Sequence, residues 1–270
     1  MRTIAIANHK GGSAKTTTTV NLGAALAARG QRVLVIDLDP LGSASAWLGV
    51  PAAQSDVTRA IRGEAELAEL VHETTAPGVQ LVPASPSIII DESQGETAVA
   101  LGFMRAMERL PALWDLVLID CAPTLRYLSV APLAIAKGIL IPVEAHVLDL
   151  GGLSSIMTMT ERVRVSLNPA LHVDGILVCR SSRTTHGRQM IERIEATYPG
   201  LTFRTQVRES TRLVEAPGFQ LPISRYAPGC TADLDYRLAA DELLERLAPP
   251  VAAPAAGGGR DPRGRGSPRS

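Results

Sequence analysis

Short apolar runs alternate with helical segments along almost the whole chain, and this alternation constrains the fold more than any other feature. Five such runs, made up mostly of apolar residues, span residues 4–7, 32–36, 116–119, 138–143 and 173–179. Such runs are typical of strands that are buried on both faces. Further strands are expected over residues 79–82 and 202–207, and helices over residues 16–28, 97–110, 152–165, 185–197 and 231–247. This order predicts an α/β fold, a mostly parallel twisted sheet with helices on both faces.

Composition divides the chain into one large domain and a tail. Hydrophobic residues make up 46% of the 270 residues, enough for a substantial core, and we expect a single domain over residues 1–248. Residues 249–270 are rich in Pro, Gly, Ala and Arg, with four arginines against one aspartate. We expect this tail to be disordered, and to be either a solvated linker or a weak electrostatic arm for nucleic acid.

Charge and cysteine content indicate a compartment but no partner. The formal net charge is zero, so only local clusters can point to a ligand. Cys121, Cys179 and Cys230 are far apart and form no C-x-x-C pair, which is typical of a reducing intracellular compartment. The first residues show no apolar signal-peptide region, and no run of 18 apolar residues occurs. We therefore expect a cytoplasmic protein.

The first expected strand leads into the stretch "NHKGGSAKTT" and then into a helix. A strand, a glycine loop and a helix in this order form a phosphate site, because the helix amides and dipole point at the anion. Gly11 and Gly12 would let the backbone approach the phosphates, Lys15 would neutralise their charge, and the Thr16 hydroxyl would ligate Mg²⁺. The alternative is an ordinary helix start with a chance GGxxK sequence.

The loop departs from the usual pattern G-x-x-x-x-G-K-[ST]. His9 and Ala14 stand in place of the two framing glycines, and a second lysine, Lys10, precedes Lys15 by five residues. If the backbone at Ala14 needs a positive φ, the methyl group adds strain of about 1 kcal/mol.

Three aspartates follow the ends of two expected strands. Asp37 and Asp39 end the stretch "VLVIDLD", and Asp120 ends "WDLVLID". The carboxyl ends of parallel strands are where ligands bind in such sheets, and a carboxylate there can position water or the magnesium shell. For Asp37 and Asp39, capping of a following helix is the alternative role.

Five blocks of the sequence, in order, resemble the ParA/Soj branch of the deviant-Walker P-loop ATPases, the group that also contains MinD. They are "KGGSAKTT", "DLDPLGSAS", "IDCAPTLRYLSV", "LIPVEAHVLDLGGL" and "RESTRLVEAP". The resemblance covers roughly residues 3–247. It implies the P-loop NTPase fold, hydrolysis of ATP, and ATP and Mg²⁺ as cofactors.

The resemblance also assigns roles to residues. Two ATP-bound subunits would face each other as a homodimer, with Lys10 reaching the partner's nucleotide much as an arginine finger does. Asp39 would orient or activate the attacking water, and Asp120 would organise magnesium. The implied catalytic residues are Lys10, Lys15 and Asp39; the nucleotide-binding residues Lys10, Gly11, Gly12, Ser13, Ala14, Lys15, Thr16, Thr17 and Asp120; and the metal-binding residues Thr16, Asp39 and Asp120.

Two arginines match family positions that bind double-stranded DNA without sequence preference, Arg183 in "SRTT" and Arg212 in "TRL". Arg180, Arg188 and Arg208 lie near them in sequence and could widen the patch. The resemblance further implies a ParB/Spo0J-like adaptor that stimulates hydrolysis, and association with the nucleoid. Because the chain begins at the first strand, we do not expect the helix-turn-helix extension of longer ParA proteins.

Other positions depart from the family pattern. Leu41 replaces a glutamine, Ser43 an asparagine and Arg126 a glycine, all in regions that respond to the nucleotide. The family places the base near the strand ends at Cys179 and residues 207–210, where this chain also departs from the usual residues.

Two other functions remain open from the sequence. A MinD-like membrane switch needs a C-terminal amphipathic helix, which "GGGRDPRGRGSPRS" does not resemble. An enzyme of the same superfamily, such as an iron–sulfur reductase, needs paired cysteines for its cluster, and no second cysteine accompanies Cys121.

Overall fold

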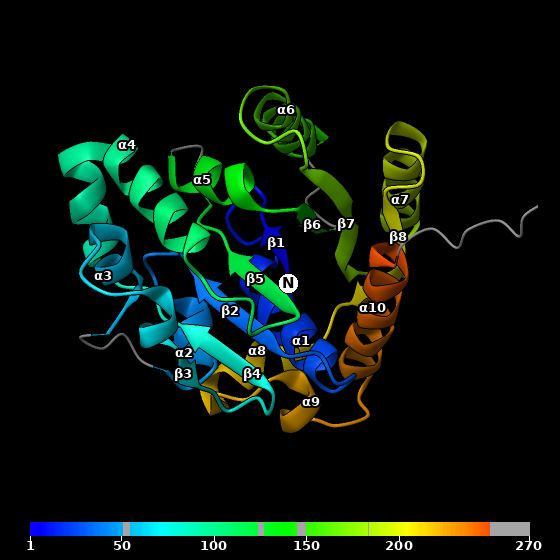
Figure 1. Ribbon diagram of the computed structural model, residues 1–270. Helices are drawn as coiled ribbons and strands as arrows, with labels where there is room; N and C mark the ends of the chain where they lie inside the picture. Colours follow the sequence, from blue (N-terminus) through cyan, green and yellow to red (C-terminus); the bar gives the residue numbers. More distant parts are fainter. Residues whose placement is uncertain (51–54, 124–126, 145–149, 183, 249–270) are drawn as a thin grey trace, which may run out of the picture.

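The computed structural model describes residues 1–50, 55–123, 127–144, 150–182 and 184–248. The described strands form one sheet in the order β3-β4-β2-β5-β1-β6-β7-β8 (Figure 1). The strands are β1 (Arg2–Ile6), β2 (Val33–Asp37), β3 (His72–Glu73), β4 (Val79–Val82), β5 (Leu116–Asp120), β6 (Gly138–Glu144), β7 (His172–Ser181) and β8 (Thr202–Arg208). The short edge strand β3 is antiparallel to β4, and the other neighbouring strands are parallel.

Helices cover both faces of this sheet because its strands are apolar on both faces. Successive β2 residues alternate between the two cores, Val33 and Val35 on one face and Leu34 and Ile36 on the other. One core contains α1, α2, α9 and α10, and the other contains α3 to α7 (Figure 1). The helices are α1 (Lys15–Ala27), α2 (Ser43–Trp47), α3 (Val57–Arg62), α4 (Ser87–Glu108), α5 (Tyr127–Ile135), α6 (Leu150–Ser166), α7 (Thr185–Thr197), α8 (Thr211–Glu215), α9 (Ile223–Tyr226) and α10 (Thr231–Leu247), with 3₁₀ turns η1 (Leu67–Leu70) and η2 (Ala216–Phe219).

The order of the central strands determines where a ligand can bind. Strand β1 lies between β5 and β6, and the chain leaves it through the glycine loop into α1. Pairing places Asp120 beside both Ile6 and Asp37, so the carboxyl ends of β1, β2 and β5 meet. Open parallel sheets bind ligands at such an edge, where the strand order reverses.

The predicted α/β fold and every predicted strand are confirmed. One helix boundary was wrong: α4 begins at Ser87, ten residues before the expected start, and Gly95 interrupts its helical backbone. The sequence also did not indicate α5, which has nine residues, or α2, α3, α8 and α9, which have four to six residues each. The latter four are too short to show a helical period, and tertiary contacts hold them in place.

The outer edge of β8 is protected by acidic side chains of α10. Both carboxylate oxygens of Glu242 accept backbone hydrogen bonds, from the N–H groups of Arg204 and Thr205 at 2.9 Å. Asp235 accepts the N–H of Arg208 at 3.0 Å. An edge strand whose N–H groups are satisfied in this way cannot pair with a second chain.

In the part of the chain that the structure describes, no helix combines the length and the apolar character that crossing a membrane requires.

Candidate functional site

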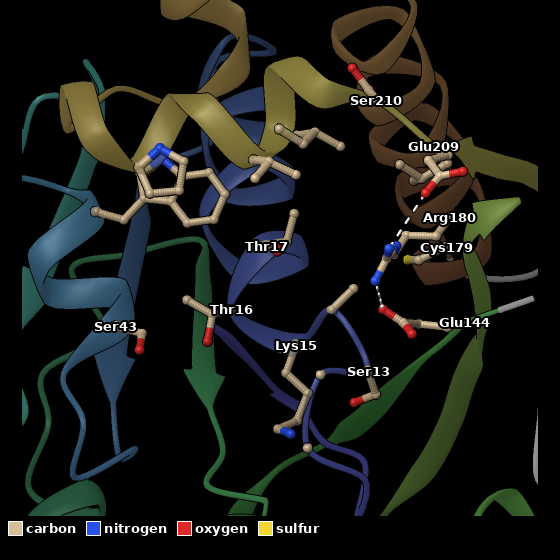
Figure 2. A pocket seen from close by; sticks show the side chains of 18 of the residues that line it. Ser13, Lys15, Thr16, Thr17, Ser43, Glu144, Cys179, Arg180, Glu209 and Ser210 are labelled. Atoms are coloured by element: carbon tan, nitrogen blue, oxygen red, sulfur yellow. Dashed lines mark hydrogen bonds and ion pairs between the residues drawn. The ribbon is translucent and has the colours of Figure 1, made fainter. Parts of the chain in front are cut away.

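A cavity of about 830 Å³ opens at the carboxyl edge of the sheet, between the glycine loop and α8 (Figure 2). Its lining brings together segments that are far apart in sequence. They are Gly11, Gly12, Ser13, Ala14, Lys15, Thr16, Thr17, Asp39, Leu41, Ser43, Trp47, Pro123, Glu144, Cys179, Arg180, Val207, Glu209, Ser210, Thr211, Leu213, Val214, Pro217 and Tyr236. The predicted nucleotide-binding loop therefore borders the cavity from Gly11 to Thr17.

The glycine loop has the backbone geometry of a phosphate cradle. Gly12 has φ +77°, and a Cβ at Gly11 or Gly12 would meet no atom within 4 Å, so the backbone there is open to a ligand. Ala14 also has a left-handed backbone, with φ 66° and ψ 24°, immediately before α1 begins at Lys15. The expectation that the methyl group of Ala14 occupies a strained conformation is confirmed.

Lys15 is buried at the first turn of α1, and only 6% of its surface is exposed. Its Nζ donates a hydrogen bond to the carbonyl oxygen of Lys10 at 3.2 Å, across the loop. Burial lowers the pKa of Lys15, while the charge of Asp120 acts in the opposite direction. An ammonium group in such surroundings gains strongly from an anionic partner, because little water solvates it.

Asp120 lies behind the loop rather than on the cavity wall. It is fully buried and accepts hydrogen bonds from the hydroxyls of Thr16 at 2.7 Å and Thr19 at 3.1 Å. Burial raises the pKa of Asp120, and the neighbouring charge of Asp37 raises it further. The carboxylate therefore orients the Thr16 hydroxyl, which itself borders the cavity.

The described residues contain no group of three His, Cys, Asp or Glu side chains that could hold a metal ion. This arrangement fits Mg²⁺ bound with a nucleotide, since Mg²⁺ keeps several waters and takes few protein ligands besides the phosphates. Thr16 and Asp39, which border the cavity, and Asp120, which accepts the Thr16 hydroxyl, would hold the ion in that case.

Asp37 and Asp39 have different roles. Asp37 is fully buried and accepts hydrogen bonds from the Ser45 N–H at 2.9 Å and hydroxyl at 2.7 Å, so it holds the start of α2. It also accepts the N–H of Asp39 at 3.0 Å. Burial raises the pKa of Asp37. The capping alternative is thus confirmed for Asp37, while Asp39 borders the cavity as predicted.

Lys10 does not border the cavity, although the glycines that follow it do. Its N–H donates to the Asn8 side chain at 3.1 Å, and Asn8 in turn donates to the Pro142 carbonyl oxygen at 2.8 Å. These contacts tie the start of the loop to β6.

The predicted basic patch is only partly present. Arg212 lies exposed on α8, 4.0 Å from Glu215, and Arg183 lies outside the described residues. Arg180 and Arg208, which could extend the patch, are both paired with acidic side chains: Arg208 binds Asp235 through two nitrogens, and Arg180 lies in the cavity between two glutamates. Arg188 is exposed on α7.

Two of the residues that depart from the family pattern border the cavity. Leu41 is 82% exposed there, and Ser43 is the first residue of α2. Arg126 lies outside the described residues. The sequence placed the base near the strand ends at Cys179 and residues 207–210, which border this opposite wall, but it did not identify Glu144 and Arg180, because they belong to no single motif. Their places at the ends of β6 and β7 were the one available signal.

Comparison with known proteins agrees with this geometry. Residues 1–173 match the family described as AAA domain. The chain is 38% identical over 252 residues to the chromosome-partitioning ATPase Soj of Thermus thermophilus, with 92% of this chain and 97% of that protein covered. It is 35% identical over 253 residues to the chromosome partitioning protein ParA of Caulobacter vibrioides, covering 91% and 95%.

Solved structures share the fold. A structure of cobyrinic acid a,c-diamide synthase from Mycobacterium smegmatis with bound ADP and magnesium has a TM-score of 0.78 and 28% identity, covering 92% of this chain and 95% of that one. The cell division ATPase MinD of Pyrococcus furiosus has a TM-score of 0.72 and 24% identity, covering 92% and 99%, a likeness of fold alone. With Soj and ParA matched over nearly their whole length, the chain belongs to the ParA/Soj family of P-loop ATPases.

Proposed function

We propose that this protein is a DNA-partitioning ATPase that binds ATP with Mg²⁺, hydrolyses it, and changes its affinity for DNA with the bound nucleotide. The observation that supports this most directly is one cavity bordered by the glycine loop, Lys15, Thr16 and Asp39. Lys15 would replace its bond to the Lys10 carbonyl oxygen by one to a phosphate oxygen. Asp39, which also borders the cavity, would position the attacking water.

The ATP-bound form would be a homodimer with the nucleotides at its interface. Lys10 supports this proposal, because it follows β1 at the loop entrance yet does not border its own cavity. A lysine in that position can neutralise the charge on a partner's triphosphate. Hydrolysis then removes part of the interface, so the nucleotide state controls the oligomeric state.

Bound to ATP, the dimer would associate with nucleoid DNA through phosphate contacts. Arg212 is suited to this, since it is exposed and its nearest carboxylate, in Glu215, is 4.0 Å away. Arg183 would act with it, and the basic tail over residues 249–270, outside the domain of residues 1–248, would add attraction. A ParB-like adaptor would stimulate hydrolysis and release the protein from DNA.

Two other activities have less support. The Mycobacterium smegmatis synthase resembles this chain at 28% identity, against 38% for Soj over a similar length. A MinD-like positioning ATPase on membranes rests on likeness of fold, at 24% identity. A test of the protein's function must therefore compare binding to DNA with binding to anionic liposomes.

The experiment is co-sedimentation of the full chain with non-specific duplex DNA in the presence of ATP, ADP or no nucleotide. We expect the protein to bind DNA with ATP but not with ADP or without nucleotide, and this binding should weaken steeply as the salt concentration rises. Lys10→Ala and Lys15→Ala should abolish it, whereas Asp39→Ala should retain it, because this variant binds ATP without turning it over.

A matched pair of arginines tests the DNA surface. Arg212→Ala should weaken ATP-dependent binding, and Arg164→Ala, which breaks a comparable helical pair with Glu161, should leave it unchanged. Equal DNA binding in all three nucleotide states would contradict the proposal. Sedimentation with anionic liposomes in place of DNA, dependent on ATP, would instead support the MinD-like function.

A further inference from the structure

Three charged side chains stand in a row across the carboxyl ends of β6, β7 and β8, on the wall of the cavity. Glu144 is the last residue of β6, Arg180 lies near the end of β7, and Glu209 directly follows β8. The Arg180 guanidinium donates to Glu144 at 3.1 Å and to Glu209 at 3.4 Å. Figure 2 shows Arg180 between the two carboxylates, on the opposite side of the cavity from Thr16 and Ser43.

The position of this row in the cavity indicates which part of a nucleotide it would meet. The glycine loop and Thr16 are suited to the phosphates, so the ribose and base must extend toward the remaining wall. That wall contains apolar side chains on which a flat ring can pack, among them Val207 and Leu213. Its charged groups include Arg180, near the end of β7, and Glu209, directly after β8.

The backbone at Arg180 is strained. It has φ 49°, a left-handed conformation that is sterically unfavourable for a residue with a Cβ. Strained residues concentrate at ligand sites, where the surrounding structure fixes them. Here the two carboxylates fix the guanidinium, and the hydrogen bond to Glu144, with its charge, raises the pKa of Arg180.

The chemistry of the pair favours one kind of base edge. A carboxylate can only accept hydrogen bonds, and a guanidinium can only donate them. Together they complement an edge that presents a donor beside an acceptor. The 6-amino group and N7 of adenine form such an edge, whereas hypoxanthine keeps N7 as an acceptor but carries a carbonyl oxygen in place of the amino group.

We propose that Arg180 and Glu209 determine the base specificity of this site: Glu209 accepts a hydrogen bond from the 6-amino group of adenine, and Arg180 donates one to N7. Glu144, whose side chain is only 12% exposed, anchors Arg180 while Glu209 turns toward the base. This inference rests on the proposed function, because it requires a nucleotide whose phosphates lie on the glycine loop.

The test is calorimetric titration of the full chain with ADP and with inosine diphosphate, neither of which the protein can consume by γ-phosphate hydrolysis. The wild type should bind ADP about tenfold or more tightly than the inosine nucleotide, the value of a hydrogen bond to a charged group. Glu209→Gln should bring the ratio close to one, because an amide can donate to the carbonyl oxygen as well as accept from the amino group.

Arg180→Ala should weaken binding of both nucleotides about tenfold. Arg180→Gly removes the same guanidinium and also relieves the left-handed backbone, so equal losses in the two variants assign the effect to the guanidinium. Arg204→Ala is the control: it removes an arginine of β8 that binds Glu245 and does not border the cavity, and both affinities should be unchanged.

The outcomes separate the two proposals. If the wild type binds ADP and the Arg180 and Glu209 variants keep the wild-type affinities and ratio, the base-recognition inference is overturned and the proposed function stands. If the wild type binds neither nucleotide, the proposed function fails, and this inference fails with it.

Discussion

Replacing Ala14 by glycine tests whether the glycine loop is held in a strained conformation. Ala14 has φ 66° and ψ 24°, at the residue before α1. Glycine adopts this conformation without a steric penalty. Ala24, in the interior of the same helix and 7% exposed, provides the control, because the same change of side chain there occurs in a regular helical backbone.

The expected free energies follow from the two environments. At position 14, relief of the left-handed conformation raises the free energy of unfolding by about 1.5 kcal/mol. The greater freedom of glycine in the unfolded chain lowers it by about 0.7 kcal/mol, and loss of the half-buried methyl group lowers it by about 0.4 kcal/mol. The net is a gain of about 0.4 kcal/mol. At Ala24 the change costs about 1 kcal/mol of helix propensity and about 0.8 kcal/mol for the buried methyl group.

The two variants should therefore differ in stability by about 2 kcal/mol, which corresponds to roughly 4–8 °C in Tm for a domain of this size. Thermal unfolding without nucleotide, followed by circular dichroism, measures this difference directly. Two variants that lose the same stability relative to the wild type would refute the reasoning, because position 14 would then behave like any helical position.

Other substitutions test the packing around the site. Glu242→Gln should cost about 2 kcal/mol in urea unfolding, because one oxygen of the side chain can no longer accept a β8 N–H. Burial raises the pKa of Glu242, but the hydrogen bonds from β8 lower that pKa by more. The stabilisation that Glu242 provides is therefore fully present above its unfolded-state pKa of about 4.3, and it is lost as pH falls through the lower pKa of the folded state. The wild type should accordingly lose more stability than Glu242→Gln between about pH 5 and about pH 3. Gly102→Ala would place a Cβ 2.2 Å from the carbonyl oxygen of Ile61, where α4 meets α3, and should destabilise the protein by about 1–3 kcal/mol in urea unfolding. Gly152→Ala in α6, where a Cβ meets nothing within 4 Å, should instead stabilise it by up to about 1 kcal/mol in the same assay.

The parts of the fold that the sequence predicted are those governed by local periodicity. Buried strands such as β2 and β5 are uniformly apolar, and longer helices such as α1 and α10 show helical spacing. The short helices escaped prediction because packing, rather than propensity, holds them. Helix α2, for example, starts where the buried carboxylate of Asp37 accepts the Ser45 N–H, a contact across eight residues.

The two sides of the cavity also differ in how well the sequence predicted them. The phosphate side is a continuous segment, Gly11 to Thr17, so its chemistry could be recognised from one motif. The opposite side depends on contacts between residues far apart in sequence: Arg180 pairs with Glu144, 36 positions earlier, and with Glu209, 29 positions later. Only the sheet order β6-β7-β8 brings these three strand ends together.

The three aspartates near the site differ in role according to where each lies relative to the end of its strand. Strand β2 ends at Asp37, so Asp39 lies outside the sheet. The last strand residue stays within the sheet, so Asp37 on β2 and Asp120 on β5 are fully buried and bond to neighbouring loop and helix residues. Asp39 lies two residues beyond the strand and reaches the cavity. At the ends of β2 and β5, therefore, the last strand residue organises the site, and at β2 the residue two positions beyond the strand can contact a ligand.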